Sequence, residues 1–291
     1  MLAEEVQATA AELRRHHNFR AAARMFAKRY CSMLAGNFLL SHFATEKVRH
    51  LMGVYVLRSN FAYGSSEEEH GTTLAGALHF AEHAGIAGRT RIATYLRLLQ
   101  VGGYLKSAKR GSDRRYIRLE STPKAIETAK GIYKNFLLPL SLLTENPTAV
   151  TDLYRDDRLL NRIVEYSYRS ILEFRYISIF TPDLAIILEK AGGYEILLLL
   201  MIAEGNSDLR TALTVYFNYG WASQQLDVPR IQIRRVMHLL VEKDLVVLHA
   251  EAGNAVEVRP CLRQLLDTLV SLHLAVIWNG VNTPVHYPAR C

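Results

Sequence analysis

The sequence predicts a mostly α-helical fold with small β-hairpins, in which one order of elements occurs twice. Apolar residues recur at helical spacing through most of the first 60 residues, where proline and glycine are sparse. Two short stretches alternate between apolar and polar residues around a polar turn, a pattern typical of hairpins. The segments that contain them align with an offset of 141 residues. Because 291 residues with 49% hydrophobic content suffice for two cores, we expect two domains.

Two helices and a hairpin are predicted between residues 73 and 121. The helices cover residues 73–101 and are interrupted at "AGIAG". The hairpin strands are "YLKSAK" and "YIRLE", on either side of the turn "RGSDRR". A further helix begins in "STPKAIETAK", where Ser121 or Thr122 is the N-cap and Pro123 takes the first helical position. Helix, helix, hairpin and helix follow one another in this order in a winged helix-turn-helix domain.

The second helix of this unit, between residues 89 and 101, has one apolar and one polar face. The residues that we expect to pack in the core are Ile92, Tyr95, Leu96 and Leu99. The residues on the opposite face are Thr90, Thr94 and Arg97. One face can therefore pack while the other meets a nucleic-acid groove.

The same order of elements recurs in the C-terminal half. The alignment lays "WASQQLDVPRIQIRRVMHLLVEKDLVVL" on "FAEHAGIAGRTRIATYLRLLQVGGYLKS". It pairs Ile233 with Ile92, Leu240 with Leu99, and Leu245 with Tyr104. A second hairpin follows, with strands "VVLHAE" and "AVEVRP" around "AGN", and then a long apolar helix. We therefore predict the internal duplication of a whole domain.

This pattern divides the chain into five parts. They are N-terminal helices at 1–42, a first winged-helix domain at 43–135, a helical connector at 136–180, a second winged-helix domain at 181–262, and a C-terminal helix and tail at 263–291. Within the connector, residues 146–175 form a long helical pattern. Its stripe contains Leu153, Leu160, Ile163 and Val164. We interpret it as a bridging or dimerising helix.

The run from Phe80 to Leu105, the wing from Lys106 to Leu119 and "STPKA" resemble the MarR-like winged-helix transcription regulators. The resemblance covers residues 43–135 and, more loosely, residues 181–278. Members of that family pair as homodimers through their terminal helices and set their recognition helices in adjacent major grooves. Two units in one chain imply two winged-helix domains joined by long helices, as an intrachain pseudo-dimer. The sequence departs from the family pattern at two places. The turn "GIAGRTRI" is one residue longer than the usual family spacing, and the second wing, "HAEAGNAVE", lacks a basic tip.

The charge of the chain is basic and concentrated in the first unit. The chain has 35 Lys and Arg against 28 Asp and Glu, a net charge of +7. Residues 85–130 hold eleven basic and three acidic residues, a net of +8. Residues 228–265 hold six basic and four acidic residues, a net of +2. This distribution favours uneven DNA contact, although a charged hairpin can also be plain solvated surface and the second unit only a packing partner.

The function that we expect is a DNA-binding transcription regulator whose partner is double-stranded DNA. Recognition helices supply base contacts and a basic wing supplies backbone contacts. The predicted DNA-binding residues are Arg89, Thr90, Arg91, Thr94, Arg97, Lys109, Arg110, Arg114, Arg115, Arg230, Gln232, Arg234 and Arg235. On the second helix, Ile231, Arg235 and His238 take the places of Thr90, Thr94 and Arg97. The alternative, from a different class, is a tandem winged-helix module that binds protein.

An enzyme is not expected, although one motif suggests a metal site. His79, Glu82 and His83 spell H-x-x-E-H, in which two histidines bind zinc and the glutamate is the general base. The residues clustered on the other side of that helix are Leu74, Ala77, Leu78, Ala81 and Ala84. The motif therefore points away from the core, whereas a catalytic zinc needs a third ligand and a water-limited cavity. We expect no metal and no cofactor.

The cysteines and apolar segments favour a soluble, cytoplasmic protein. Cys31, Cys261 and Cys291 have no paired spacing, and we expect Cys31 to be a buried structural thiol rather than a redox sensor. The start lacks a secretory pattern, and "YEILLLLMIAEG" is too short to cross a bilayer, so no membrane contact is expected. A small-molecule effector, enclosed by helices of residues 136–175, and a homodimer stay open.

Overall fold

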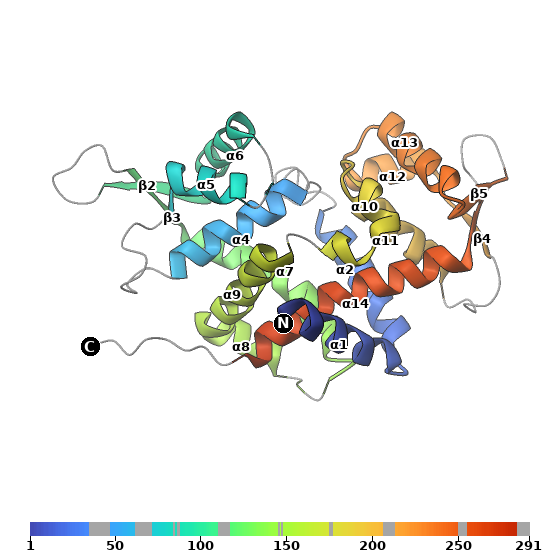
Figure 1. Ribbon diagram of the computed structural model, residues 1–291, viewed down its shortest axis with the longest axis horizontal. Helices are drawn as coiled ribbons and strands as arrows, with labels where there is room; N and C mark the ends of the chain where they lie inside the picture. Colours follow the sequence, from blue (N-terminus) through green and yellow to red (C-terminus); the bar gives the residue numbers. More distant parts are fainter. Residues whose placement is uncertain are drawn as a thin grey trace.

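The structure is a computed structural model of the chain, and it is mostly helical with two small antiparallel sheets (Figure 1). This confirms the predicted class at that level. The residues that it describes are 1–34, 47–61, 72–83, 85, 88–109, 117–144, 146, 148–174, 177–205, 213–249 and 255–283.

The two halves of the chain contain similar series of elements. The N-terminal half contains α1 (Leu2–Arg15), α2 (Phe19–Leu34), α4 (Lys47–Phe61), β1 (Thr72–Thr73), α5 (Leu74–His83), α6 (Arg89–Val101), β2 (Leu105–Lys109), β3 (Ile117–Ser121) and α7 (Pro123–Leu140). The C-terminal half contains α8 (Ala149–Arg155), α9 (Asp157–Phe174), η1 (Ile177–Phe180), α10 (Pro182–Leu188), α11 (Gly193–Glu204), β4 (Leu213–Tyr216), α12 (Tyr219–Leu226), α13 (Arg230–Glu242), β5 (Val246–Leu248), β6 (Ala255–Val258) and α14 (Pro260–Asn282).

Local sequence signals account for several helix ends. Thr122 caps α7, because its side chain accepts a hydrogen bond from the Ala125 N–H, and Pro123 follows at the first helical position. The predicted helical connector is divided into α8 and α9 at Asp156, whose backbone is extended. Its apolar stripe is buried as expected, at Leu153, Leu160, Ile163 and Val164.

The two sheets have the same topology. In each, the strand that precedes the helix pair lies beside the last strand of the hairpin, in the orders β1-β3-β2 and β4-β6-β5. The turn from α6 to β2 and the turn from α13 to β5 also contain the same backbone hydrogen bonds. The Tyr104 N–H donates to the Leu99 carbonyl at 2.8 Å, and the Leu245 N–H donates to the Leu240 carbonyl at 2.9 Å. These are the positions that the 141-residue offset pairs.

Left-handed backbone recurs at corresponding turns of the two halves. Gly103 and Asp244 have φ of +75° and +52° after α6 and α13. Gly85 and Asp227 have φ of +61° and +53° after α5 and α12. Glycine adopts this region without a steric cost, and aspartate tolerates it better than most residues. At Gly103 and Asp244, which the 141-residue offset pairs, the two turns therefore share a backbone conformation.

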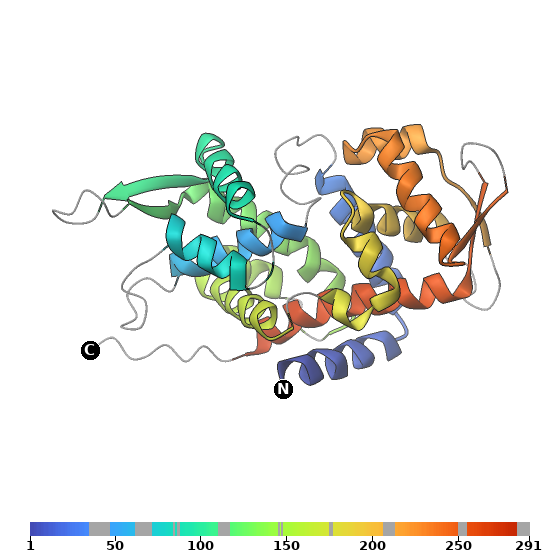
Figure 2. The same ribbon diagram turned by 45° about the horizontal axis from the view of Figure 1, so that its top comes forward.

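The halves are interlocked by exchanged helices. Helix α2 of the N-terminal half packs against α11 of the C-terminal half, and α9 of the C-terminal half packs against α4 of the N-terminal half. Helices α2 and α9 also contact α7 and α14 of their own halves. By element order α2 corresponds to α9, α4 to α11 and α7 to α14, so each contact has a counterpart. Figures 1 and 2 show the two lobes that these helices join.

Helix α14 passes through the single apolar core that spans the described residues. It packs against α1, α9, α7, α2 and α11. Among the described residues it is the one helix long and apolar enough to cross a membrane, with a mean hydropathy of 1.3 in its most apolar window. Since 67% of that window is buried inside the protein, the same composition fits a core helix.

Gly280 allows α14 to approach α9 closely. A Cβ built on Gly280 would lie 2.8 Å from the Ile163 Cα, a backbone atom that cannot move aside cheaply. We expect Gly280→Ala to lower the free energy of unfolding by about 1–3 kcal/mol, as overpacking does. Gly131 of α7 is the matched control, because no atom lies within 4 Å of its Cβ position. Gly131→Ala should raise stability slightly through helix propensity. Urea denaturation measures both, and equal effects would contradict this close approach.

Glu195, in the first turn of α11, is a buried carboxyl near the exchanged helix α2. It is 1% exposed, and neither carboxylate oxygen has a hydrogen-bond partner among the described residues. Burial raises its pKa from the ordinary 4.5 to about 7. Burial also raises the pKa of the Cys31 thiol, and the charge of Glu195 adds to that increase. Cys31 is buried as expected, and its raised pKa favours the unreactive thiol form.

The raised pKa of Glu195 predicts a pH-dependent stability. The folded state holds this proton more tightly than the unfolded state, so the stabilising contribution is complete below pH 4.5 and is lost as the pH rises through about 7. The free energy of unfolding of Glu195→Gln should fall less between pH 5 and pH 8 than that of the wild type. Asp267, whose pKa burial raises to about 6, should supply a residual slope in both. Equal slopes in urea denaturation would contradict the assignment.

Candidate nucleic-acid interface

Helix α6 has the two faces that its sequence predicts. The buried residues are Ile92, Tyr95, Leu96 and Leu99. The five predicted DNA-binding residues of this helix are all exposed: Arg89, Thr90, Arg91, Thr94 and Arg97. The Thr94 hydroxyl donates a hydrogen bond to the Thr90 carbonyl at 2.9 Å, so its oxygen is left as an acceptor toward solvent.

Helix α13 repeats this arrangement in the C-terminal half. Its buried residues are Ile233, Val236, Met237 and Leu240. Its exposed residues include Arg230, Ile231, Arg234, Arg235 and His238. Both helices span 13 residues. Figures 1 and 2 show α6 and α13 at the same upper edge of the molecule, one on each lobe.

Gln232 does not share the exposed position of the other predicted residues. It is half-buried, and its Nε2 donates a hydrogen bond to the Ala191 carbonyl at 3.5 Å. The turn between α10 and α11 packs beside α13 there, so the side chain faces the protein. Sequence spacing could not show this neighbour, and the contact of Gln232 with DNA stays a prediction from the sequence.

The first unit contains the predicted hairpin. Lys109 ends β2 opposite Ile117 of β3. Lys106 forms an ion pair with Glu120 at 3.3 Å across the strands. The side chain of Lys109 and residues Arg110, Arg114 and Arg115 lie outside the described residues. Their expected contact with DNA stays a prediction from the sequence.

Among the described basic residues of the first unit, two are buried. Arg118 in β3 is 5% exposed, and Lys130 in α7 is 7% exposed. The Lys130 ammonium is paired with Glu127 at 3.1 Å and with Asp157 at 2.8 Å. The net charge of +8 therefore overstates the positive charge that this unit exposes to solvent. Strand alternation and helix packing turn these two cations inward, which a count along the chain cannot reveal.

In the hairpin of the second unit the described basic side chains lie beside carboxylates. His249 Nε2 lies 2.8 Å from Glu257 Oε2. Arg259 pairs with Asp244 at 3.3 Å and with Glu257 at 3.8 Å. Residues 250–254 lie outside the described residues. The described part of this wing accordingly lacks the cationic surface that the first wing has in its sequence.

The described side chains of the H-x-x-E-H motif point away from the core, as predicted, although Leu74, expected on the opposite side of the helix, is 45% exposed. His79 and Glu82 are exposed on α5, whereas Ala77 and Ala81 are buried. The side chain of His83 lies outside the described residues. Among the residues that the structure describes, no group of three or more His, Cys, Asp or Glu side chains could hold a metal ion.

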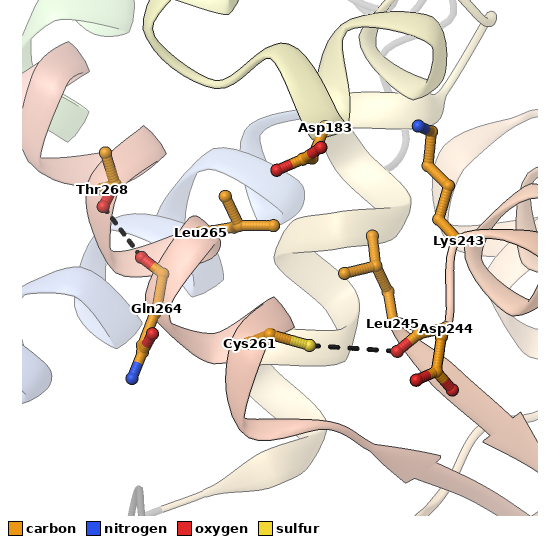
Figure 3. Close-up of a pocket in the computed structure, with 8 residues that line it drawn as sticks. All are labelled: Asp183, Lys243, Asp244, Leu245, Cys261, Gln264, Leu265 and Thr268. Carbon is orange, nitrogen blue, oxygen red and sulfur yellow. Dashed lines mark hydrogen bonds between the residues drawn. The ribbon is translucent and has the colours of Figure 1, made fainter.

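An open cavity of about 670 Å³ lies behind the C-terminal end of α13, where the α13–β5 turn meets α10 and α14 (Figure 3). Its lining includes Asp183, Lys243, Asp244, Cys261 and Gln264. The Cys261 thiol points to the Asp244 carbonyl at 3.8 Å. The cavity lies outside the 136–175 stretch that the sequence suggests for an effector.

Sequence reasoning missed the aromatic residues at the start of α12. Trp221 is 45% exposed, and Tyr219 is half-buried. The signal in the sequence was a pair of aromatic residues on either side of Gly220, at the start of the helix that precedes α13.

Comparisons of the chain with protein-family models, with curated proteins and with solved structures found no match. The interpretation of the site therefore rests on its geometry.

Proposed function

We propose that this protein is a DNA-binding transcription regulator with two MarR-like winged-helix units in one chain, arranged as a pseudo-dimer. The observation that carries the proposal is the pair α6 and α13, which both expose arginines at one edge of the molecule. Each helix follows a shorter helix and precedes a hairpin, as a recognition helix does.

The positions of the hairpins support the same proposal. They extend from opposite ends of the long axis, outside the two recognition helices (Figure 1). In that arrangement the helices enter adjacent major grooves while the hairpins reach the flanking backbone. Three exposed arginines on each recognition helix favour a polyanionic partner. They are Arg89, Arg91 and Arg97 on α6, and Arg230, Arg234 and Arg235 on α13.

The two recognition faces differ in chemistry, so the proposed DNA site is asymmetric. Ile231 stands where α6 has Thr90, and it is 55% exposed. An exposed isoleucine can pack against a thymine methyl, which a threonine hydroxyl does less well. Arg235 and His238 stand where α6 has Thr94 and Arg97. One chain should therefore occupy an imperfect palindrome with half-sites roughly 34 Å apart.

The competing function is a protein-binding module. Leu98 and Val101 near the end of α6 are 43% and 75% exposed, which favours some apolar partner there. The wing-tip residues Arg110, Arg114 and Arg115 separate the two functions. Changing them to Glu should weaken DNA binding to all sequences if they contact the backbone, and should leave it unaltered if the wing is incidental.

Selection of duplexes from a random library, followed by sequencing, tests the proposal. We expect a two-part motif and a log-log salt slope of several units. Arg97→Ala and Arg235→Ala should each cost about 1–3 kcal/mol and relax the preference in only one half-site. Arg158→Gln, at an exposed arginine of α9, is the matched control and should change neither. Unselective binding, or a perfect palindrome held by two chains, would contradict the proposal.

A further inference from the structure

The first turn of α12 forms a surface that has no counterpart on α5. The Asn218 side chain caps the helix by accepting a hydrogen bond from the Trp221 N–H at 2.8 Å. The ring of Tyr219 meets Phe217 edge to face, with centroids 6.1 Å apart, while the Trp221 ring is 45% exposed. The exposed face of α5 carries His79 and Glu82 instead.

Two arginines of α13 adjoin this turn. The guanidinium of Arg230 lies directly over Gly220, because a Cβ there would be 2.9 Å from its Nη2. Only glycine leaves that space free. Burial raises the pKa of Tyr219, and the charge of Arg234 opposes this increase. Arg230 and Arg234 are one helical turn apart and share a face of α13.

We propose that Tyr219, Trp221, Arg230 and Arg234 bind the phosphodiester backbone of duplex DNA, beside the groove that α13 enters. We call these four residues the arginine–aromatic edge. The inference rests on the proposed function and names the part of the second unit that holds the backbone. In helix-turn-helix docking the first helix of the pair crosses the backbone, and here that helix is α12.

The chemistry of the edge fits a phosphate. Guanidinium groups bind phosphate with paired, charge-assisted hydrogen bonds. The indole N–H and the phenol hydroxyl are further donors, and DNA phosphates accept from side chains of this kind. The two arginines also favour an anionic partner over an apolar one, although Trp221 is exposed.

The need for such an edge is specific to the second unit. In its hairpin the described basic side chains, His249 and Arg259, lie within 4 Å of carboxylates. The first unit instead has a basic wing tip in its sequence. The edge therefore supplies the backbone contact in the second unit from the helix side rather than from the hairpin side.

Gly220→Ala tests the edge without changing the net charge. The added Cβ displaces the far end of the flexible Arg230 side chain, which should cost little stability. We expect lower affinity for duplex DNA and a log-log salt slope shallower by about one unit, as for one lost phosphate contact. Arg230→Gln and Arg234→Gln should each lower the affinity and the salt slope in the same way. These two variants keep the test valid if Gly220→Ala disturbs the Asn218 cap. Gly131→Ala and Arg158→Gln are the matched controls, with the wild-type slope expected.

The measurement uses the full chain, a fluorescent random-sequence duplex and a duplex recovered by selection. Loss of slope in the three edge variants, with both controls unchanged, would support the inference. Wild-type affinity and slope in all three would overturn it and leave the proposed function standing. Salt-independent binding or no binding by the wild type itself would instead overturn the proposed function, and the edge with it.

Discussion

The close packing of α14 against α9 and α1 determines how the two halves sit together. At Gly280 the helices approach until a single added methyl group would meet the backbone of Ile163. Helix α2 packs on α11, and α9 packs on α4, so each half is held by a helix of the other. The two proposed recognition helices, α6 and α13, are thereby held together in one chain. A homodimer must bring its halves together at an entropic cost that this chain meets when it folds.

Buried polar contacts accompany this junction. Arg263 of α14 is fully buried and pairs with Glu204 of α11 at 2.7 Å. Asn279 of α14 donates to the Tyr166 hydroxyl of α9 at 2.9 Å and accepts from the Thr9 hydroxyl of α1. Desolvation offsets much of the attraction in such pairs, but removal of one partner leaves an unpaired polar group in the core. The junction therefore tolerates few alternative registers of α14, and the spacing of α6 and α13 depends on that register.

Apolar periodicity, turn residues and capping residues in the sequence were enough to predict helices and the two hairpins. The buried and exposed faces of α6 and α13 follow from apolar spacing, and the cap at Thr122 follows from its neighbour Pro123. The features that the sequence did not predict depend on contacts between distant segments. Gln232 faces Ala191, and Lys130 faces Asp157, because other helices pack there. The exchange of α2 and α9 has no local signal at all, since any amphipathic helix can pack on either half.

The two halves have the same sheet topology but differ in their surface chemistry, which is the basis for the proposed asymmetric DNA site. One unit has a basic wing in its sequence, and the other has the arginine–aromatic edge. The most direct measurement is the stoichiometry of the protein on a duplex recovered by selection, determined by native mass spectrometry. The account predicts one chain for each two-part site. Two chains on each site, with each chain contributing one recognition helix, would contradict it.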